Sequence, residues 1–276
     1  MNTTCELGTN LEIENAKRKL DARRGEYAKL LAEYDELTGT VRRNLETLYM
    51  MRIGRLEYRL FSLQIRVRQL KREIALYQAA KNRGETISAE EVLTIIELEF
   101  AEFKTMLTEQ QEKIRNAEEF HFSPKLSAAD AKAIRTLYRD MVRKLHPDLN
   151  RDLPEEAKRL WDRITAAYKN NDWQELNILA DMVYDLLDGK DPADGDPSRI
   201  EQLLAEERRI AAKTAQLRER IDELQKQPPY SYRELLQNEA AVAAKRRELQ
   251  ELRHRFEEYI AELTASRDEL CGGKNA

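Results

Sequence analysis

A long run of regularly spaced apolar residues lies within residues 49–77 and strongly limits the folds open to this chain. They follow one another at alternating steps of four and three, without a break in the pattern. They are Tyr49, Ile53, Leu56, Leu60, Leu63, Val67, Leu70, Ile74 and Tyr77. This spacing places all of them on one face of an α-helix and is typical of a coiled-coil seam. Such a seam predicts a partner helix that buries it.

A second apolar run supplies the predicted partner. The first helix is expected to end at Gly84, because glycine suits a helix C-terminus. Ser88, followed three residues later by Glu91, predicts a capping box at the start of the next helix. That helix carries apolar residues at the same kind of spacing, namely Val92, Ile96, Phe100, Phe103, Leu107 and Ile114. The short connection predicts an antiparallel hairpin of residues 41–83 with 88–120.

Charge supports this pairing. Residues 41–83 contain eleven Lys or Arg against three Glu, whereas residues 88–120 contain three Lys or Arg against nine Glu. Opposite charges favour pairing of the two helices and disfavour pairing of either with its own copy. The basic helix is rich in arginine, with Arg52, Arg55, Arg59, Arg66, Arg68 and Arg72. Nucleic-acid binding is therefore an alternative. We rank it lower and expect no nucleic-acid partner, because the acidic helix competes for the same cations.

Residues 1–120 as a whole are predicted to form an N-terminal helical arm. From about residue 11 to residue 37 the chain is helix-forming, with a rough apolar stripe of Leu20, Tyr27, Leu30, Leu31 and Tyr34. Gly39 is suited to end this helix, yet the helical phase of the apolar residues continues from Leu37 to Val41. The sequence leaves both a turn at Gly39 and a continuous helix open.

The composition favours long exposed helices over one large core. Of the 276 residues, 36% are charged, only 7% are aromatic and nine are glycine. Cys5 and Cys271 stand near opposite ends without a partner motif, so neither a disulfide framework nor a zinc site is predicted. No leader-like segment and no apolar run long enough to span a bilayer is present. We expect a soluble cytoplasmic protein with no membrane partner.

A different pattern follows the predicted hairpin. Ser127 predicts the start of a helix, and Pro147 predicts its end, because proline lacks an amide hydrogen and pushes the preceding residue out of helical geometry. One face of this helix is apolar and consists of Ile134, Leu137, Tyr138, Met141 and Leu145. A second face carries the cations Lys132, Arg135, Arg139 and Arg143. We expect this basic stripe to face solvent and to lead to His146, Pro147 and Asp148, a region suited to docking an acidic surface.

Two further helices are predicted after this His-Pro-Asp turn. Asp152 and Pro154 mark the start of the first, which carries the apolar stripe Leu160, Trp161, Ile164, Ala167 and Tyr168. Residues 173–187 form the second and are apolar enough to pack against the others. The helices on either side of the turn are expected to be antiparallel, with the turn at their tip. Trp161 and Trp173 are predicted to belong to the core of this small domain.

These residues carry a resemblance to a known family. A helix with Tyr138 and Arg139 precedes His146-Pro147-Asp148, and the following helix contains the signature Ile164-Thr-Ala-Ala-Tyr168. An isolated His-Pro-Asp tripeptide is a weak signal, but both flanking helices are in register with it. Residues 127–188 resemble a J-domain, the module through which DnaJ-type co-chaperones engage DnaK-type heat-shock ATPases.

The resemblance implies a protein-binding site and no catalytic residue in this chain. It implies that His146, Pro147 and Asp148 contact the ATPase, that Arg135, Arg139 and Arg143 pair with its acidic residues, and that ATP hydrolysis by the partner becomes faster. Lys144 and Tyr138 complete the candidate partner-binding set. A common turn, in which proline ends a helix and aspartate satisfies a loop amide, is the alternative explanation for the tripeptide. No cofactor and no metal is expected, and His121 and His254 are predicted to be surface or packing residues.

The chain also departs from the family pattern. The usual short first helix with Tyr-x-x-Leu-Gly is absent, so the end of the acidic helix, or Phe120 and Phe122, is expected to provide its packing. A Gly/Phe-rich segment and Cys-x-x-Cys zinc repeats are absent as well. The flanks resemble those of bacterial proteins in which a J-domain lies between coiled coils.

The C-terminal third is predicted to form a second antiparallel hairpin. Residues 189–198 hold prolines and glycines among aspartates and are predicted to be a linker. Two seams follow within residues 199–270: Leu203, Ile210, Leu217, Ile221 and Leu224 in the first helix, and Leu235, Val242, Leu249, Phe256, Ile260 and Leu263 in the second. Ser231 with Glu234 predicts a capping box at the start of the second helix. Residues 271–276 are expected to be a disordered tail.

The predicted fold class is therefore all-α. A small J-like helical domain, residues 121–188, is flanked by two antiparallel coiled-coil hairpins. The leading functional hypothesis is a non-enzymatic co-chaperone whose arms position a client or the DnaK-type partner. The alternative is a structural or scaffolding coiled-coil protein whose J-like domain stimulates no ATPase. The sequence leaves both a monomer and a homodimer open.

Overall fold

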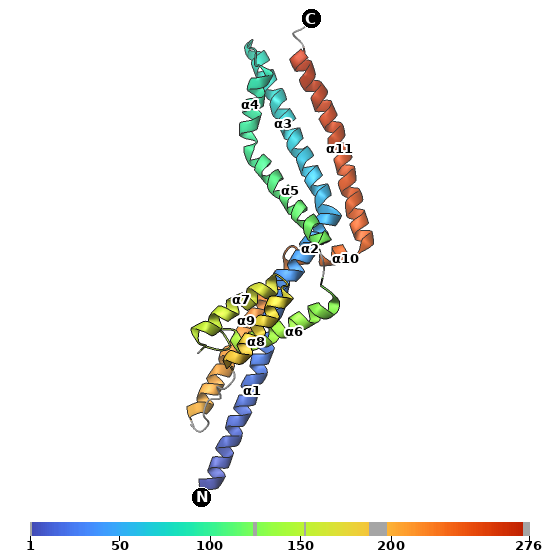
Figure 1. Ribbon diagram of the computed structural model, residues 1–276. Coiled ribbons are helices and arrows are strands. Elements are labelled where there is room, and N and C mark those ends of the chain that lie inside the picture. The colour runs from blue at the N-terminus through green and yellow to red at the C-terminus, as the bar shows by residue number, and fades with distance from the viewer. Residues whose placement is uncertain (1, 124–125, 152, 188–197, 273–276) are drawn as a thin grey trace. The chain divides into compact units, whose positions relative to one another are not determined.

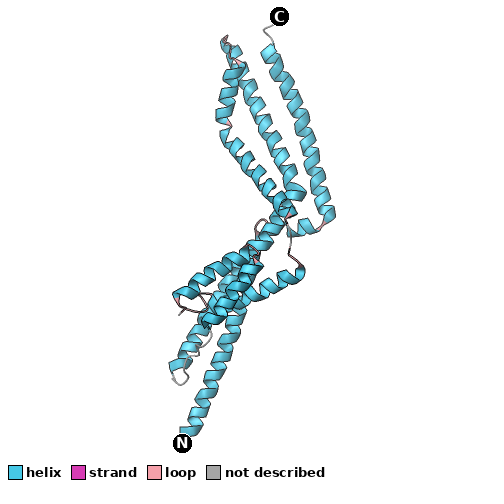
Figure 2. Cartoon of the chain, in the orientation of Figure 1, coloured by secondary structure: helices cyan, strands magenta, loops and turns pink. Residues whose placement is uncertain are grey.

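The computed structural model describes residues 2–123, 126–151, 153–187 and 198–272, and every regular element in these ranges is a helix (Figure 2). The all-α prediction is therefore confirmed for the part of the chain that is described. Most of the predicted linker and the last four residues of the predicted tail lie outside the described ranges. None of the described helices is both long and apolar enough to cross a membrane.

The first part of the chain is helical from Asn2 to Arg83. The elements are α1 (Asn2–Glu36), the π-helical segment η1 (Leu37–Val41), α2 (Arg42–Tyr49), the π-helical segment η2 (Met50–Gly54) and α3 (Arg55–Arg83). At Gly39 the chain keeps its helical hydrogen bonding in the wider π form. The open question of a turn or a continuous helix is thus resolved in favour of helix. Each π-helical stretch shifts the phase of the apolar stripe, because its turn holds more residues than an α-turn.

The helical chain divides into two compact units that differ from the predicted domains. The first unit contains residues 1–43 and 124–230, and the second contains residues 44–123 and 231–276. The predicted N-terminal arm of residues 1–120 therefore contributes to both units, as does the C-terminal segment. Each unit is built from segments that are far apart in the sequence, whereas the sequence pattern predicted domains that follow one another along the chain.

In the first unit, α1 is paired with α9 (Ser198–Lys226). Arg23 on α1 forms an ion pair with Glu207 at 3.0 Å. Farther along both helices, the Arg220 guanidinium lies 5.4 Å from the centroid of the Tyr34 ring. Because residue numbers rise together in the two helices, the pair is parallel. Several apolar side chains are buried in these two helices, namely Leu20, Tyr27, Ala28, Ile210, Leu217 and Ile221.

The same unit contains a three-helix segment: α6 (Ala128–Leu145), α7 (Glu155–Lys169) and α8 (Trp173–Leu187). The predicted caps at the ends of α6 are confirmed, since the Ser127 side chain accepts a hydrogen bond from the Asp130 amide and the helix ends before Pro147. The buried residues of this segment include Ile134, Met141, Leu145, Leu149, Ile164, Leu176, Leu179 and Val183. Trp161 and Trp173, which were predicted to be core residues, are only partly buried.

In the second unit, α3 has neighbours on two sides. It runs parallel to α11 (Glu239–Gly272), as Figure 1 shows, with an ion pair from Arg267 to Glu73 at 3.2 Å. Just before α3, Arg52 of η2 pairs with Glu239 at the start of α11, at 2.7 Å. The chain also returns along α3 through α4 (Ala89–Glu99) and α5 (Ala101–Phe122). Here Arg72 pairs with Glu99 at 2.7 Å and Arg55 pairs with Glu118, which is an antiparallel arrangement.

The apolar seam of residues 49–77 is therefore shared rather than used by one hairpin. Ile53 and Leu60 form a buried cluster with Leu236 and Leu249 of the C-terminal segment. The predicted isolated hairpin of residues 41–83 with 88–120 is in fact part of a three-helix arrangement. The glycine and serine predictions at its tip are confirmed, because Gly84 has the left-handed φ of 70° and Ser88 forms a capping box with Glu91.

The predicted C-terminal hairpin of residues 199–270 is wrong. Its first helix packs on α1 and its second packs on α3. The physical reason is that a seam accepts any helix with a complementary apolar face, and α1 and α3 offer such faces to α9 and α11. The predicted capping box of Ser231 with Glu234 is also absent. A 3-10 turn (Tyr230–Tyr232) and the short α10 (Arg233–Gln237) precede α11, and the Asn238 side chain caps α11 by accepting from the Ala241 amide at 3.1 Å.

Candidate functional site

The His-Pro-Asp turn is a tight turn held by the backbone of His146. Its carbonyl oxygen accepts hydrogen bonds from the amides of Leu149, at 2.9 Å, and Asn150, at 3.0 Å. The Asp148 amide donates to Nδ1 of the His146 ring at 3.1 Å. Leu149 is buried with 1% of its surface exposed, whereas Pro147 is exposed. The turn is thus fixed at both ends while its proline faces outward.

Aromatic stacking joins the two helices on either side of the turn. The rings of Tyr138 on α6 and Tyr168 on α7 stack with centroids 3.8 Å apart and planes 4° apart. Trp161 extends this stack toward the turn, where its ring meets the edge of His146 with centroids 5.2 Å apart. Tyr138 is fully buried, and its hydroxyl donates to Asp35 Oδ2 at 2.7 Å. Tyr138 was predicted to belong to the partner-binding set. In this structure it is a buried core residue.

Asp148 is bound by three side chains from outside the three-helix segment. Tyr27 on α1 donates its hydroxyl proton to Oδ2 at 2.8 Å, and Lys213 on α9 donates to Oδ1. Arg209 on α9 donates to the main-chain oxygen at 2.6 Å. We call Tyr27, Arg209 and Lys213 the clasp. The clasp therefore binds the Asp148 side chain, which the sequence predicted to be available to a partner.

The electrostatics of Asp148 follow from these contacts. Partial burial by itself raises the pKa of the Asp148 carboxyl, but the hydrogen bonds from Lys213 and Tyr27 lower it more, so the pKa lies below its ordinary value. Burial raises the pKa of the Tyr27 hydroxyl, and the bond to Asp148 raises it further. The carboxylate and the protonated phenol are therefore the forms in contact at neutral pH.

His146 is held in its neutral form. Burial lowers the pKa of its imidazole, the charge of Lys213 lowers it as well, and the charges of Asp148 and Asp35 oppose the effect without reversing it. A neutral ring is required for Nδ1 to accept the Asp148 amide proton, so the hydrogen bond and the pKa agree.

The basic stripe is only partly free. Arg135 pairs with Glu36 of α1 at 2.8 Å, and Arg143 pairs with Asp21 of the same helix. The side chain of each remains about half exposed, so both arginines face solvent as expected, but they are already paired with carboxylates of the same chain. Lys132 and Arg139 are exposed and have no ion-pair partner among the described residues.

Two further expectations are changed by the packing of this unit. Lys144 lies over the Tyr184 ring at 3.6 Å from its centroid, so it contacts the three-helix segment itself. α6 is covered by α1, whereas Phe122 is 78% exposed. α1 therefore provides the packing that had been assigned to Phe122 or its neighbours.

The clasp residues were missed by sequence reasoning. Arg209 and Lys213 stand one helical turn apart on α9, where they read as ordinary charged surface positions. Glu206 holds Arg209 in place by accepting from its Nε at 2.8 Å. These residues are more than sixty positions from Asp148, and no local pattern links the two.

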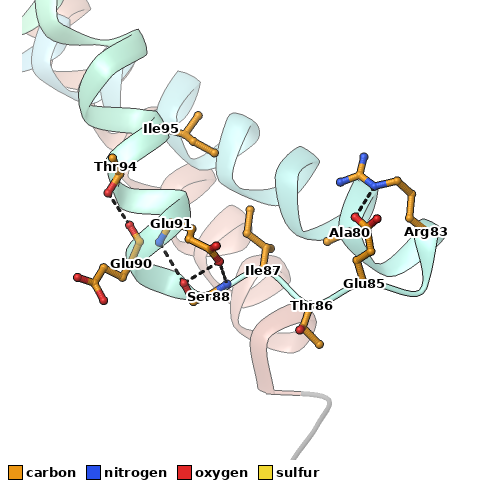
Figure 3. Close-up of a pocket in the computed structure, with 10 residues that line it drawn as sticks. All are labelled: Ala80, Arg83, Glu85, Thr86, Ile87, Ser88, Glu90, Glu91, Thr94 and Ile95. Carbon is orange, nitrogen blue, oxygen red and sulfur yellow. Dashed lines mark hydrogen bonds and ion pairs between the residues drawn. The ribbon is translucent and has the colours of Figure 1, made fainter.

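The other candidate binding surfaces have polar groups that are mostly bonded within the chain. A pocket of about 660 Å³ lies at the turn between α3 and α4 (Figure 3). Its polar groups bond to one another, because Ser88 and Glu91 form the helix cap and Arg83 pairs with Glu85 at 2.7 Å. Several arginines of α3 are paired with carboxylates, among them Arg55, Arg66 and Arg72. His121 and His254 are exposed, and no group of three or more potential metal ligands occurs in the described ranges.

The chain matches no protein-family model, no curated protein and no solved structure. The function must therefore be inferred from the site itself.

Proposed function

We propose that the protein is a non-enzymatic co-chaperone of the J-domain type. It docks on a DnaK-type heat-shock ATPase through the His146-Pro147-Asp148 turn and the basic helix before it, and accelerates ATP hydrolysis by that partner. The observation that supports this most is the placement of the turn. It lies between two helices joined by the Tyr138–Tyr168 stack, so the residues that carry the resemblance to J-domains act as one structural unit.

The exposed part of the turn suits such a role. Pro147 faces outward, and Arg139 is an exposed cation without an internal partner among the described residues. A rim cation of this kind speeds encounter with an acidic surface and orients it. A short rigid turn that contacts a two-state ATPase can bias it toward the hydrolysing state, provided that it binds that state more tightly. The helical arms are proposed to position a client or the partner itself.

Single-turnover ATP hydrolysis by a DnaK-type ATPase tests the proposal. The full chain is expected to raise the rate, and Pro147→Ala to abolish the increase, because the turn loses its fixed backbone. Pro154→Ala, an exposed proline at the start of α7, is the matched control and is expected to behave as the wild type. Arg139→Ala should weaken the apparent affinity roughly threefold, as expected for a rim charge, whereas the exposed Arg159→Ala on α7 should not.

A second candidate is favoured by one specific observation. Both carboxylate oxygens of Asp148 and its main-chain oxygen are already bound within the chain. This supports a scaffolding protein in which the turn is an internal joint. In that case Asp148→Asn would lower the thermal stability. Neither the wild type nor a variant in which Tyr27 and Lys213 no longer bind Asp148 would change the ATPase rate. That result would overturn the co-chaperone proposal.

A further inference from the structure

The chain's own helices contact the proposed docking surface of the three-helix segment. Five of the eight candidate partner-binding residues contact α1 or α9, namely Arg135, Tyr138, Arg143, His146 and Asp148. The contacts come from two helices that are paired with each other, not from scattered loops. We propose that the α1–α9 pair is an autoinhibitory element, with the clasp holding the His-Pro-Asp turn in a closed state. This inference rests on the proposed co-chaperone function.

The contacts of α1 and α9 match the chemistry of the surface that they touch. α1 offers carboxylates to the basic stripe, with Glu36 on Arg135 and Asp21 on Arg143. These are the groups that an acidic partner surface would offer to the same arginines. The clasp at the same time offers cations and a hydroxyl to Asp148. α1 and α9 together thus pair with the positive groups Arg135 and Arg143 and with the negative group Asp148. A partner that binds these groups must displace the two helices.

The contacts at Asp148 also exclude a partner. Lys213 and Tyr27 each take one oxygen of the Asp148 carboxylate, and Tyr27 also places its ring against His146, with centroids 6.3 Å apart. The Asp148 side chain retains only about a third of its exposed surface. A partner group that binds this carboxylate must occupy the position of one of these side chains, so closed and docked states are mutually exclusive.

The closed state is held by contacts that are weak enough to be reversible. Arg135 and Arg143 are about half exposed in their pairs with α1, and exposed ion pairs of this kind contribute little each and weaken with salt. The apparent affinity for a partner is then reduced by the fraction of molecules that are open. Removing clasp contacts should raise that fraction without altering the turn itself.

The test compares a released variant with a matched control in the full chain. Tyr27→Phe with Lys213→Ala removes both side-chain contacts to Asp148 and leaves the turn intact. Tyr34→Phe with Lys226→Ala makes the same chemical changes on the same two helices, at positions whose hydroxyl and ammonium groups bond to nothing among the described residues. Far-UV circular dichroism verifies that both variants remain helical.

Two readouts keep the inference and the proposed function apart. Hydrogen exchange of peptides covering residues 142–151 should be faster in the released variant than in the control and the wild type. The concentration needed for half-maximal stimulation of a DnaK-type ATPase should fall about tenfold on release, as expected when a closed state is reduced to a minor population.

Each outcome has one meaning. Unchanged exchange in the released variant overturns the clasp, whatever the ATPase does. Faster exchange with stimulation equal to that of the wild type overturns autoinhibition but leaves the co-chaperone function in place. Faster exchange with no stimulation by any variant overturns the proposed function and autoinhibition with it.

Discussion

At the scale of single residues, Asp148 and His146 belong to the exposed turn and also to the packing of the first unit. The aspartate caps no helix; it binds Tyr27 and Lys213, while its amide donates to the imidazole of His146. Tyr138 stacks on Trp161 and Tyr168, and this aromatic stack joins the two helices on either side of the turn. The tripeptide is thus coupled to the packing of the unit, and its protonation state bears on stability as well as on binding.

The stability of the first unit should depend on pH through His146. The pKa of its imidazole is lowered in the folded chain, so the unfolded state takes up a proton first as the pH falls. Stability should therefore be complete above about pH 6.5, the ordinary pKa of histidine, and decline as the pH falls from there toward the folded value. The groups around the ring are Tyr27, Asp35, Asp148, Trp161 and Lys213.

A proton-titration measurement checks this prediction. NMR of the His146 ring in the folded protein should give a pKa below the ordinary value, and the pH dependence of unfolding in this window should flatten in His146→Gln. Asp148 contributes in a separate window: because its folded pKa is lowered, its stabilisation is present above about pH 3.9 and is lost as the pH falls through the folded value. A His146 pKa at or above 6.5 would contradict the assigned burial.

At the scale of the elements, the helices are set by short-range signals. Gly84 ends α3 with a left-handed φ of 70°, Ser88 begins α4 and Ser127 begins α6. The structure adds π-helical segments at Leu37–Val41 and Met50–Gly54, which the apolar periodicity did not reveal. These segments change which face of the helix points toward its partner.

Two glycine substitutions should have opposite effects. Gly25 lies inside α1, and a Cβ added there would meet nothing within 4 Å, so Gly25→Ala should stabilise the chain by about 0.5–1 kcal/mol through helix propensity. Gly84→Ala should destabilise it by roughly 1 kcal/mol, because alanine is strained at this φ. Chemical denaturation of both variants measures the difference. Equal effects would show that the two backbone conformations are not as described.

At the scale of the whole molecule, the chain is built from parallel pairs between distant segments. α9 lies along α1, and α11 lies along α3. In the sequence, the three-helix segment of residues 128–187 lies between α1 and α9. All three belong to the first unit. This connectivity is what brings Arg209 and Lys213 to Asp148.

The pairing predicts the behaviour of the C-terminal segment in isolation. Residues 198–272 should be largely unfolded or self-associated as a separate peptide, because the helices that bury their seams are α1 and α3. Addition of residues 2–83 should restore helix content. Far-UV circular dichroism measures both. A monomeric, fully helical peptide 198–272 would instead support the hairpin that the sequence predicted.

The local structure follows from the amino-acid sequence alone. Helical class, several helix ends and the position of the His-Pro-Asp turn follow from periodicity and capping residues, which act over a few neighbouring positions. The sequence also singled out Arg139 and Pro147, whose exposure needs no distant partner.

The choice of partner for each apolar seam becomes visible only in the folded chain. Apolar seams such as those of residues 49–77 and 235–263 carry little information about their partner, because any complementary helix face can bury them. The clasp on Asp148 depends on that choice, since Tyr27 and Lys213 lie on helices far from the turn in sequence. The Asp148 carboxylate, which the sequence predicts to be available at the turn, is therefore bound within the fold, whereas Pro147 and Arg139 remain exposed.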